Sequence, residues 1–227
     1  MAVMMLSSCG SGGSNEVTSG SNEVTSGSNE VTSGSNEVTS GSNEVTIGEQ
    51  VWMTQNLNVD KFRNGDPIPR AVTAEQWREA GRNRQPAWCY YENDWIFEEP
   101  YGKLYNWYAV NDSRGLAPVG YHIPSDAEWT ELENFLGTYD AGIKMKSRSA
   151  WKSYGNGTDS YGFSGFPGGM RHHDGFFENI GFYGKWWSST EVSTDYAWMR
   201  YLNYGEDNVF RSNNSKEHGY SVRCLRD

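Results

Sequence analysis

YGFSGFPGGMRHHDGFFENIGFYGKWWSST, residues 161–190, sets the architecture of this chain. The segment is dense in glycine and aromatic residues and carries few helix signals. Short apolar runs separated by glycine-rich turns are typical of β-strands joined by tight loops. The same pattern continues to SVRCLRD at residues 221–227, so we expect residues 161–227 to form the core of one compact domain.

Aromatic residues are concentrated outside the first fifty residues. All 10 Trp, 14 Tyr and 9 Phe lie in residues 51–227. A buried aromatic side chain removes about 150–250 Å² from water, so aromatic packing can hold together a domain with many loops. Residues 51–227 are therefore long enough and apolar enough for one domain with its own core.

The net charge of −10 is concentrated at the amino end. Residues 1–50 hold six glutamates and no Lys or Arg, which favours a solubility role over a binding surface. The sequence has no basic patch suited to nucleic acid and no run of eighteen apolar residues that would cross a membrane. We therefore expect no nucleic-acid partner, and membrane contact only through a lipid anchor.

Residues 1–13, MAVMMLSSCGSGG, are similar to the end of a bacterial lipoprotein signal. Leu6-Ser7-Ser8-Cys9 matches the lipobox pattern, in which the cysteine is lipidated and becomes the new amino terminus. The apolar segment before it is short and has no basic start, so we expect either an upstream start or a shortened leader. The alternative is a free cysteine in a flexible leader. We favour lipidation at Cys9, which predicts an exported protein anchored at a bacterial cell surface or outer membrane.

A seven-residue repeat fills residues 14–45. SNEVTSG occupies residues 14–20, 21–27, 28–34 and 35–41, and SNEVTIG follows at 42–48. Each unit has one apolar position, whereas a coiled coil needs two, and its Gly and Ser residues oppose helix formation. We therefore predict a hydrophilic stalk, with a stacked β-repeat as the alternative. Ile47 marks the start of a domain over residues 46–227, with a first strand pair turning at Gly48-Glu49.

Two helices of this domain have strong start signals. Thr73 with Gln76 and Ser125 with Glu128 each form a capping box, which predicts helices over residues 74–80 and 125–137. Helical spacing predicts a third helix over residues 102–111 and a short helical turn near 143–147. Strands are expected at residues 51–58, 88–91, 163–166, 184–189, 196–202, 209–212 and 220–225.

Several motifs, in order, resemble the Fibrobacter succinogenes major paralogous domain. They are IGEQVWMTQNLNV (47–59), NGDPIP (64–69), LYNWYAVND (104–112), RGLAPVGYH (114–122), HIPSDAEW (122–129), GFSGFPGGMR (162–171), KWWSST (185–190) and YSVRCLRD (220–227). More remotely, HIPSDAEW and the closing VRC are similar to formylglycine-generating, or sulfatase-modifying, enzymes, which have a variant of the C-type lectin fold. The resemblance implies an α+β C-type-lectin-like domain. It would have two main helices against small irregular antiparallel sheets, and its first and last strands would be adjacent.

The cysteines argue against the chemistry of those enzymes. Formylglycine-generating enzymes use two redox-active cysteines in the carboxyl half, where this chain has only Cys224. We therefore predict a protein that is not an enzyme, with a divergent enzyme of that superfamily as the alternative. A disulfide between Cys89 and Cys224 is expected instead, and it fits an oxidising export route. It would close a loop of about 135 residues and contribute roughly 4–5 kcal/mol in the chain-entropy model.

His172-His173-Asp174 is the most metal-like cluster in the sequence. Adjacent histidines in a strand point to opposite faces and rarely bind one ion, so we favour a loop tip over a ligand set. No metal or other cofactor is predicted. The motif Glu99-Pro100-Tyr101 differs from the Glu-Pro-Asn signature of lectins, which disfavours calcium-dependent sugar binding.

The segment 196–218 is the predicted working surface, because polar positions alternate through it and Tyr, Asn and Ser make adaptable contacts. Its frame resembles the variable region of proteins targeted by diversity-generating retroelements, and the alternative is an ordinary sheet with polar loops. We predict an extracellular glycan or protein as the ligand, with a structural, self-associating surface component as another alternative. The candidate binding residues are Tyr196, Trp198, Arg200, Asn203, Tyr204, Asp207, Asn208, Ser212, Asn213 and Asn214.

Overall fold

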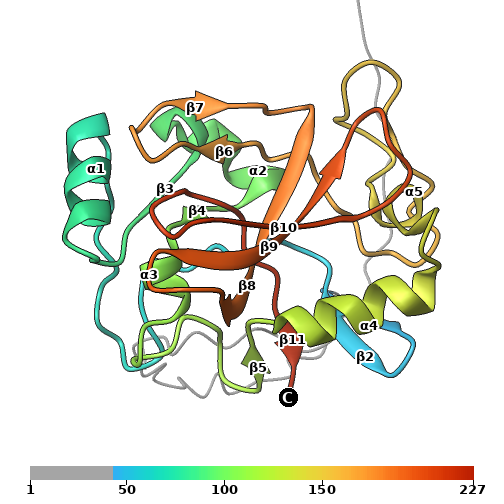
Figure 1. The fold of residues 1–227 in the computed structure, drawn as a ribbon, viewed down its shortest axis with the longest axis horizontal. Coiled ribbons are helices and arrows are strands. Elements are labelled where there is room, and N and C mark those ends of the chain that lie inside the picture. The colour runs from blue at the N-terminus through green and yellow to red at the C-terminus, as the bar shows by residue number, and fades with distance from the viewer. Residues whose placement is uncertain (1–42) are drawn as a thin grey trace, which may run out of the picture. The chain divides into compact units, whose positions relative to one another are not determined.

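The computed structural model of this chain describes residues 43–227 (Figure 1). The helices are α1 (Ala74–Arg82), α2 (Glu98–Tyr101), α3 (Trp107–Val110), α4 (Asp126–Leu136) and α5 (Ala141–Met145), with 3-10 turns η1 (Tyr91–Asn93) and η2 (Trp95–Phe97). The strands are β1 (Glu44–Ile47), β2 (Gln50–Met53), β3 (Trp88–Cys89), β4 (Leu104–Tyr105), β5 (Tyr121–His122), β6 (Met170–Arg171), β7 (Phe177–Glu178), β8 (Tyr183–Glu191), β9 (Tyr196–Asn203), β10 (Phe210–Ser215) and β11 (Leu225–Arg226). This is an α+β fold with few helices and small antiparallel sheets, as expected.

The predicted lipidation at Cys9 and the repeat stalk, up to residue 42, lie outside the described residues. Within residues 43–227, no helix combines the length and the apolar character needed to span a bilayer. The first strand begins at Glu44, two residues before the expected domain start at residue 46.

A four-stranded sheet with the order β1-β2-β11-β5 joins the two ends of the domain. The predicted turn at Gly48-Glu49 is confirmed: Ile47 pairs with Gln50, and Gly48 takes a φ of +64°. Leu225 of β11 pairs with Trp52 on one side and His122 on the other. The first and last strands of the domain therefore lie in one sheet, which Figure 1 shows beside the C-terminus.

The second main sheet has the order β10-β9-β8 and lies at the centre of Figure 1. Trp187 pairs with Met199, and a register shift follows before Glu191 pairs with Ala197. Ser221 bridges the other edge of β8, but residues 219–221 do not form a regular strand, because their backbone groups bond to three different segments. Gly219 N–H donates to Arg171, Tyr220 N–H to Tyr105 and Ser221 N–H to Lys185.

The two capping boxes form as predicted. The Thr73 and Ser125 hydroxyls accept from the backbone N–H groups of Gln76 and Glu128, at the starts of α1 and α4. The predicted helix over residues 102–111 is shorter, because Leu104–Tyr105 pairs with β3 and only Trp107–Val110 is helical. The strand expected at residues 163–166 is wrong, since only an isolated bridge from Gly165 to Lys146 forms there.

Aromatic side chains fill the core. Under α4, Trp129 packs against Trp52 and Trp186, with ring centroids 4.8 and 6.5 Å apart. A second cluster centres on Trp187, whose ring lies 4.4 Å from Tyr220. The segment 161–190 therefore supplies much of the core, with Trp186 and Trp187 both buried.

The expected disulfide between Cys89 and Cys224 does not form, and this prediction is wrong. Both residues are free, fully buried thiols. They belong to different hydrophobic clusters, Cys89 with Trp77 and Cys224 with Trp187. Burial raises the pKa of Cys89 to about 11 and that of Cys224 to about 12, so both behave as small apolar core residues rather than reactive thiols.

Candidate functional site

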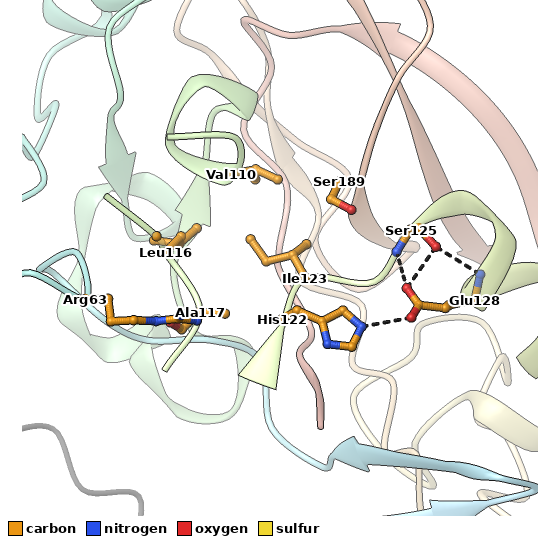
Figure 2. A pocket seen from close by; sticks show the side chains of 10 residues that line it. Arg63, Val110, Leu116, Ala117, His122, Ile123, Ser125, Glu128 and Ser189 are labelled. Carbon is orange, nitrogen blue, oxygen red and sulfur yellow. Dashed lines mark hydrogen bonds and ion pairs between the residues drawn. The ribbon is translucent and has the colours of Figure 1, made fainter. Parts of the chain in front are cut away.

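A pocket of about 480 Å³ lies beside β5 and the start of α4 (Figure 2). Its lining residues are Arg63, Val110, Gly115, Leu116, Ala117, His122, Ile123, Ser125, Glu128 and Ser189. Figure 2 shows the His122 ring directed toward Glu128. The His122 Nε2 atom lies 2.9 Å from Glu128 Oε1, and Nδ1 lies 2.8 Å from Asp227 Oδ1.

The electrostatics of this pair follow from its hydrogen bonds. Burial of the ring opposes protonation, but hydrogen bonds to Asp227 and Glu128 outweigh burial and raise the pKa of His122. Burial also opposes the charge of Glu128, but bonds from the Ser125 backbone and hydroxyl outweigh it and lower the pKa of that carboxyl. The pair is therefore held as an ion pair at weakly acidic pH.

The charged groups of this pocket are engaged within the protein. Glu128 closes the capping box of α4, and both His122 nitrogens have carboxylate partners. Arg63 donates to the carbonyls of Ala117, Pro118 and Tyr121. A catalytic pocket presents polar groups that converge on a substrate, whereas these groups stabilise the loops around β5.

The predicted binding residues lie together on one hairpin but not on one face. Four are on β9 (Tyr196, Trp198, Arg200, Asn203), three in the following turn (Tyr204, Asp207, Asn208) and three on β10 (Ser212, Asn213, Asn214). Side chains alternate across a strand. The pairing of Asn213 with Trp198 and of Ser212 with Met199 therefore divides the set between two faces.

On the face toward α4, Arg200 is a structural residue. Its side chain is 1% exposed and bonds to Asp126 at 2.7 Å, to Thr130 at 2.9 Å and to Glu133. Asp126 also pairs with Arg211, whose guanidinium lies 3.4 Å from the centroid of the Trp198 ring. All the donor groups of Arg200 are directed at α4, which removes it from the candidate ligand-binding set.

Burial raises the pKa of both carboxyl groups, but their hydrogen bonds outweigh it only at Asp126. Burial opposes the charge of Asp126, but hydrogen bonds from Arg211 and Arg200 outweigh it and keep the pKa of Asp126 below its usual value. Burial raises the pKa of Glu133, and its bond to Arg200 only partly opposes this effect. Arg200 is therefore the main partner that keeps Glu133 charged inside the protein.

The opposite face of the sheet carries a row of half-buried aromatic rings. Tyr201 and Phe210 stack with centroids 4.7 Å apart and an interplanar angle of 5°, and Tyr183 lies 6.0 Å from Tyr201. The Lys185 ammonium lies 5.3 Å from the Tyr183 ring centroid. Asn214 donates to the Tyr220 hydroxyl at 2.7 Å. We name this surface, formed by Tyr183, Lys185, Tyr201, Phe210, Ser212 and Asn214, the aromatic face.

Four of these residues were missed in the sequence. Tyr183, Lys185, Tyr201 and Phe210 are ordinary strand residues by composition, and only the pairing of Lys185 and Phe210 with Tyr201 brings them together. Burial lowers the pKa of Lys185 to about 8. The sequence does hold one signal for Phe210. Side chains alternate between the two faces of a strand, so Phe210 shares a face with the predicted binding residues Ser212 and Asn214.

Exposed aromatic residues continue around the hairpin. Tyr196 is 47% exposed, and Tyr204 packs edge-on against Phe182 with centroids 5.3 Å apart. The turn at residues 204–209 rests on α5, because Ile143 N–H donates to the Asp207 carbonyl at 2.9 Å. Tyr204 and Asp207 are therefore exposed on a supported turn.

His172-His173-Asp174 lies at the tip of the β6–β7 hairpin, as predicted. The argument that adjacent histidines diverge is wrong here, because both residues follow the last strand residue, Arg171. Their ring centroids are 4.1 Å apart, and one ligand atom from each of these histidines and from Asp174 lies within 4.8 Å of the others.

Comparison with known proteins supports the sequence resemblance. Neither the curated proteins nor the solved structures include a match to this chain. The model of the Fibrobacter succinogenes major domain matches residues 45–226, which span β1 to β11 and both of the main sheets. The chain therefore belongs to the Fibrobacter succinogenes major domain family.

Proposed function

We propose that this chain is a non-catalytic, lipid-anchored protein of the bacterial surface, whose domain binds an extracellular glycan. The observation that carries this proposal is the stacked pair of Tyr201 and Phe210 on the aromatic face. Flat rings offer apolar surface to the C–H groups of a sugar. The Asn214 amide, which bonds to Tyr220 and Ser215, and the Ser212 hydroxyl, which bonds to the Asn213 carbonyl, each retain further hydrogen-bonding capacity for a ligand. A few polar groups among aromatic residues are typical of ligand sites.

The fold we propose is C-type-lectin-like. Three features support this assignment: the first and last strands in one sheet with β2 between them, two main helices that start at capping boxes, and a separate β8–β10 sheet with irregular neighbours. In this arrangement the β8–β10 sheet displays the ligand-binding surface, and the β1-β2-β11-β5 sheet joins the ends of the domain.

A protein ligand is the second candidate, because large aromatic side chains are exposed around the β8–β10 sheet. Tyr196, Tyr204 and Phe182 are 47%, 36% and 37% exposed. Tyrosine supplies rigid contact area at a low entropic cost, and exposed apolar patches mark interaction sites in soluble domains.

A glycan array, followed by titration of each positive glycan, tests the proposal. We expect Tyr201→Ala and Phe210→Ala each to weaken binding about ten-fold or more, because stacked aromatic residues are frequent binding hot spots. Tyr139→Ala is the matched control, since Tyr139 is 90% exposed and follows α4, and it should leave affinity unchanged.

Circular dichroism and thermal unfolding would establish that each variant is folded. The proposal fails if the array gives no binder, or if both aromatic variants bind a positive glycan as tightly as the unchanged chain. Binding of an extracellular protein that is lost in the same two variants would instead favour the second candidate.

A further inference from the structure

Three of the four histidines of this chain gather in one place. The centroid of the His218 ring lies 4.8 Å from that of His172 and 5.3 Å from that of His173. The Nδ1 atoms of His172 and His173 lie 2.7 and 3.0 Å from the same Asp174 oxygen. The fourth histidine, His122, pairs with Glu128 and Asp227 at the pocket beside β5.

The backbone explains this grouping. Arg171 and Gly219 form an antiparallel bridge, with N–H groups donating in both directions at 3.0 and 2.7 Å. In an antiparallel pair, the residue after Arg171 lies opposite the residue before Gly219. His172 therefore lies beside His218. His173 and Asp174 then follow in the turn, which closes with Gly175 N–H donating to the His172 carbonyl.

Packing holds the turn in this position. Gly175 has a φ of +92°, and a Cβ atom there would lie 2.5 Å from the Ala74 Cα atom at the start of α1. Arg78 of α1 donates to the Asp174 carbonyl at 3.2 Å. On the other segment, Trp77 donates to the Glu217 carbonyl at 3.0 Å. Helix α1 therefore contacts both segments that carry the histidines.

We propose that His172, His173, His218 and Asp174 form a binding site for a zinc-type divalent cation. Histidine nitrogen and carboxylate oxygen are ordinary zinc ligands, and four of them match the usual tetrahedral number. One ligand atom from each of His172, His173 and Asp174 already lies within 4.8 Å of the others. Zinc-to-ligand bonds of about 2.0–2.1 Å place tetrahedral ligands roughly 3.4 Å apart, so these three atoms must approach one another by about 1.4 Å at most. The centroid of the His218 ring lies within 5.3 Å of both other histidine rings, near enough for its Nε2 atom to supply the fourth ligand.

His218 is prepared for this role by its own hydrogen bond. Its Nδ1 atom lies 3.2 Å from the Ser215 carbonyl, which fixes Nδ1 as the donor and leaves Nε2 with its lone pair. The residue is 5% exposed and stacks on Tyr220, with centroids 5.9 Å apart, so its ring is held in place.

The charges nearby have opposite signs. The negative charge of the Asp174 carboxylate favours a cation at this position. The positive charge of the Lys185 ammonium, by contrast, disfavours a further positive charge at His218. Glu178, on β7, attracts Lys185. The bound cation would join the β6–β7 tip to the connection after β10, and would stabilise the folded chain because the unfolded chain lacks the assembled site.

Isothermal titration of the full chain with zinc chloride tests this site. Cys9→Ser is used as the background, because a free thiol outside the described residues would itself bind zinc. We expect one zinc ion per chain and a rise in the thermal unfolding midpoint that a chelator reverses. The double variant His172→Ala/His173→Ala should lose this binding, and His218→Ala should weaken it about ten-fold or more.

His122→Ala is the matched control, since it removes the one histidine outside the cluster and should leave zinc affinity unchanged. If His218→Ala does not fold, His173→Ala alone replaces it, because that side chain is 48% exposed. The site is refuted if zinc does not saturate at one ion per chain. It is equally refuted if the double variant binds zinc as tightly as the background chain, or if His122→Ala is the variant that loses binding.

Discussion

Buried arginines stabilise this aromatic domain through hydrogen bonds that the sequence does not reveal. Arg171, Arg200 and Arg223 are each at most 1% exposed. Arg223 donates to the Asn56 side chain at 2.9 Å and to the Met53 carbonyl at 2.9 Å. A guanidinium group can be buried when its donors are all satisfied, so these residues belong to the framework rather than to a binding surface.

Replacement of Arg200 should be strongly destabilising. Arg200→Ala removes the buried guanidinium that pairs with Asp126 and with the partly exposed Glu133, which should cost about 2–3 kcal/mol of unfolding free energy in urea denaturation. Arg226→Ala is the control, because Arg226 is 51% exposed and its pair with Glu44 should contribute less than about 1 kcal/mol. The double variant Arg200→Met/Glu133→Leu should recover most of the loss. Equal effects of the two single variants would contradict this assignment.

The His122 ion pair should make stability depend on pH. The pKa of His122 is raised in the folded state above its usual 6.5, so its stabilising contribution is present below that value and is lost as pH rises through the folded pKa. We expect the stability difference between the unchanged chain and His122→Gln to shrink between about pH 5.5 and pH 8.5. The change should stay below about 1 kcal/mol, because the pair is partly exposed. A difference that grows with pH would refute the assignment.

Two predictions about single residues failed for the same physical reason. The disulfide between Cys89 and Cys224 and the divergence of His172 from His173 both depend on where side chains lie in space. Composition can show that two thiols are available, but only packing places them in different clusters. Similarly, the rule that adjacent side chains point to opposite faces holds in a strand, but in the turn after Arg171 the two histidine rings lie close together.

The secondary-structure elements divide into those with local signals and those without. Helices α1 and α4 were predictable because each capping box is a contact between residues three positions apart. The paired strands β8, β9 and β10 were also predictable in approximate extent. Their register was not, since it depends on pairs such as Trp187 with Met199. The aromatic face exists only because of that register.

The turn after β9 should depend on a close contact with α5. A Cβ atom on Gly142 would lie 2.3 Å from the Asn208 carbonyl oxygen. We expect Gly142→Ala to destabilise the domain by about 1–3 kcal/mol, because the backbone must shift, and to change the amide NMR signals of residues 204–209. Gly205→Ala is the control within the same turn, since the nearest atom to its Cβ would be 3.8 Å away. A harmless Gly142→Ala would contradict the contact.

In the molecule as a whole, family membership was predictable from the sequence, whereas the arrangement of side chains on each face of the sheet was not. The family match over residues 45–226 nearly coincides with the expected domain of residues 46–227. The motifs that carry this match also build the core, because HIPSDAEW opens α4 and KWWSST contributes Trp186 and Trp187. Ligand contacts depend on which rings share a face, and sequence motifs do not contain that information.

The lipid anchor can be tested on the intact cell. We expect the chain with its natural leader to fractionate with membranes and to incorporate labelled palmitate. Cys9→Ser should move most of the protein to the soluble fraction, because the acyl chains attached at Cys9 are the proposed source of its membrane affinity. Cys89→Ser is the control, since that thiol is buried within the domain. Unchanged membrane association of Cys9→Ser would contradict the proposed anchor.

NMR titration of the isotopically labelled chain with its best-binding glycan would locate the ligand. If the aromatic face is the binding surface, the largest shift changes will centre on Tyr201, Phe210 and Asn214. Amide signals around His122 and Glu128 should stay unchanged, because that pocket lies beside β5 and its charged groups have partners within the protein. Shift changes centred on His122, with none at Tyr201 or Phe210, would contradict the proposal.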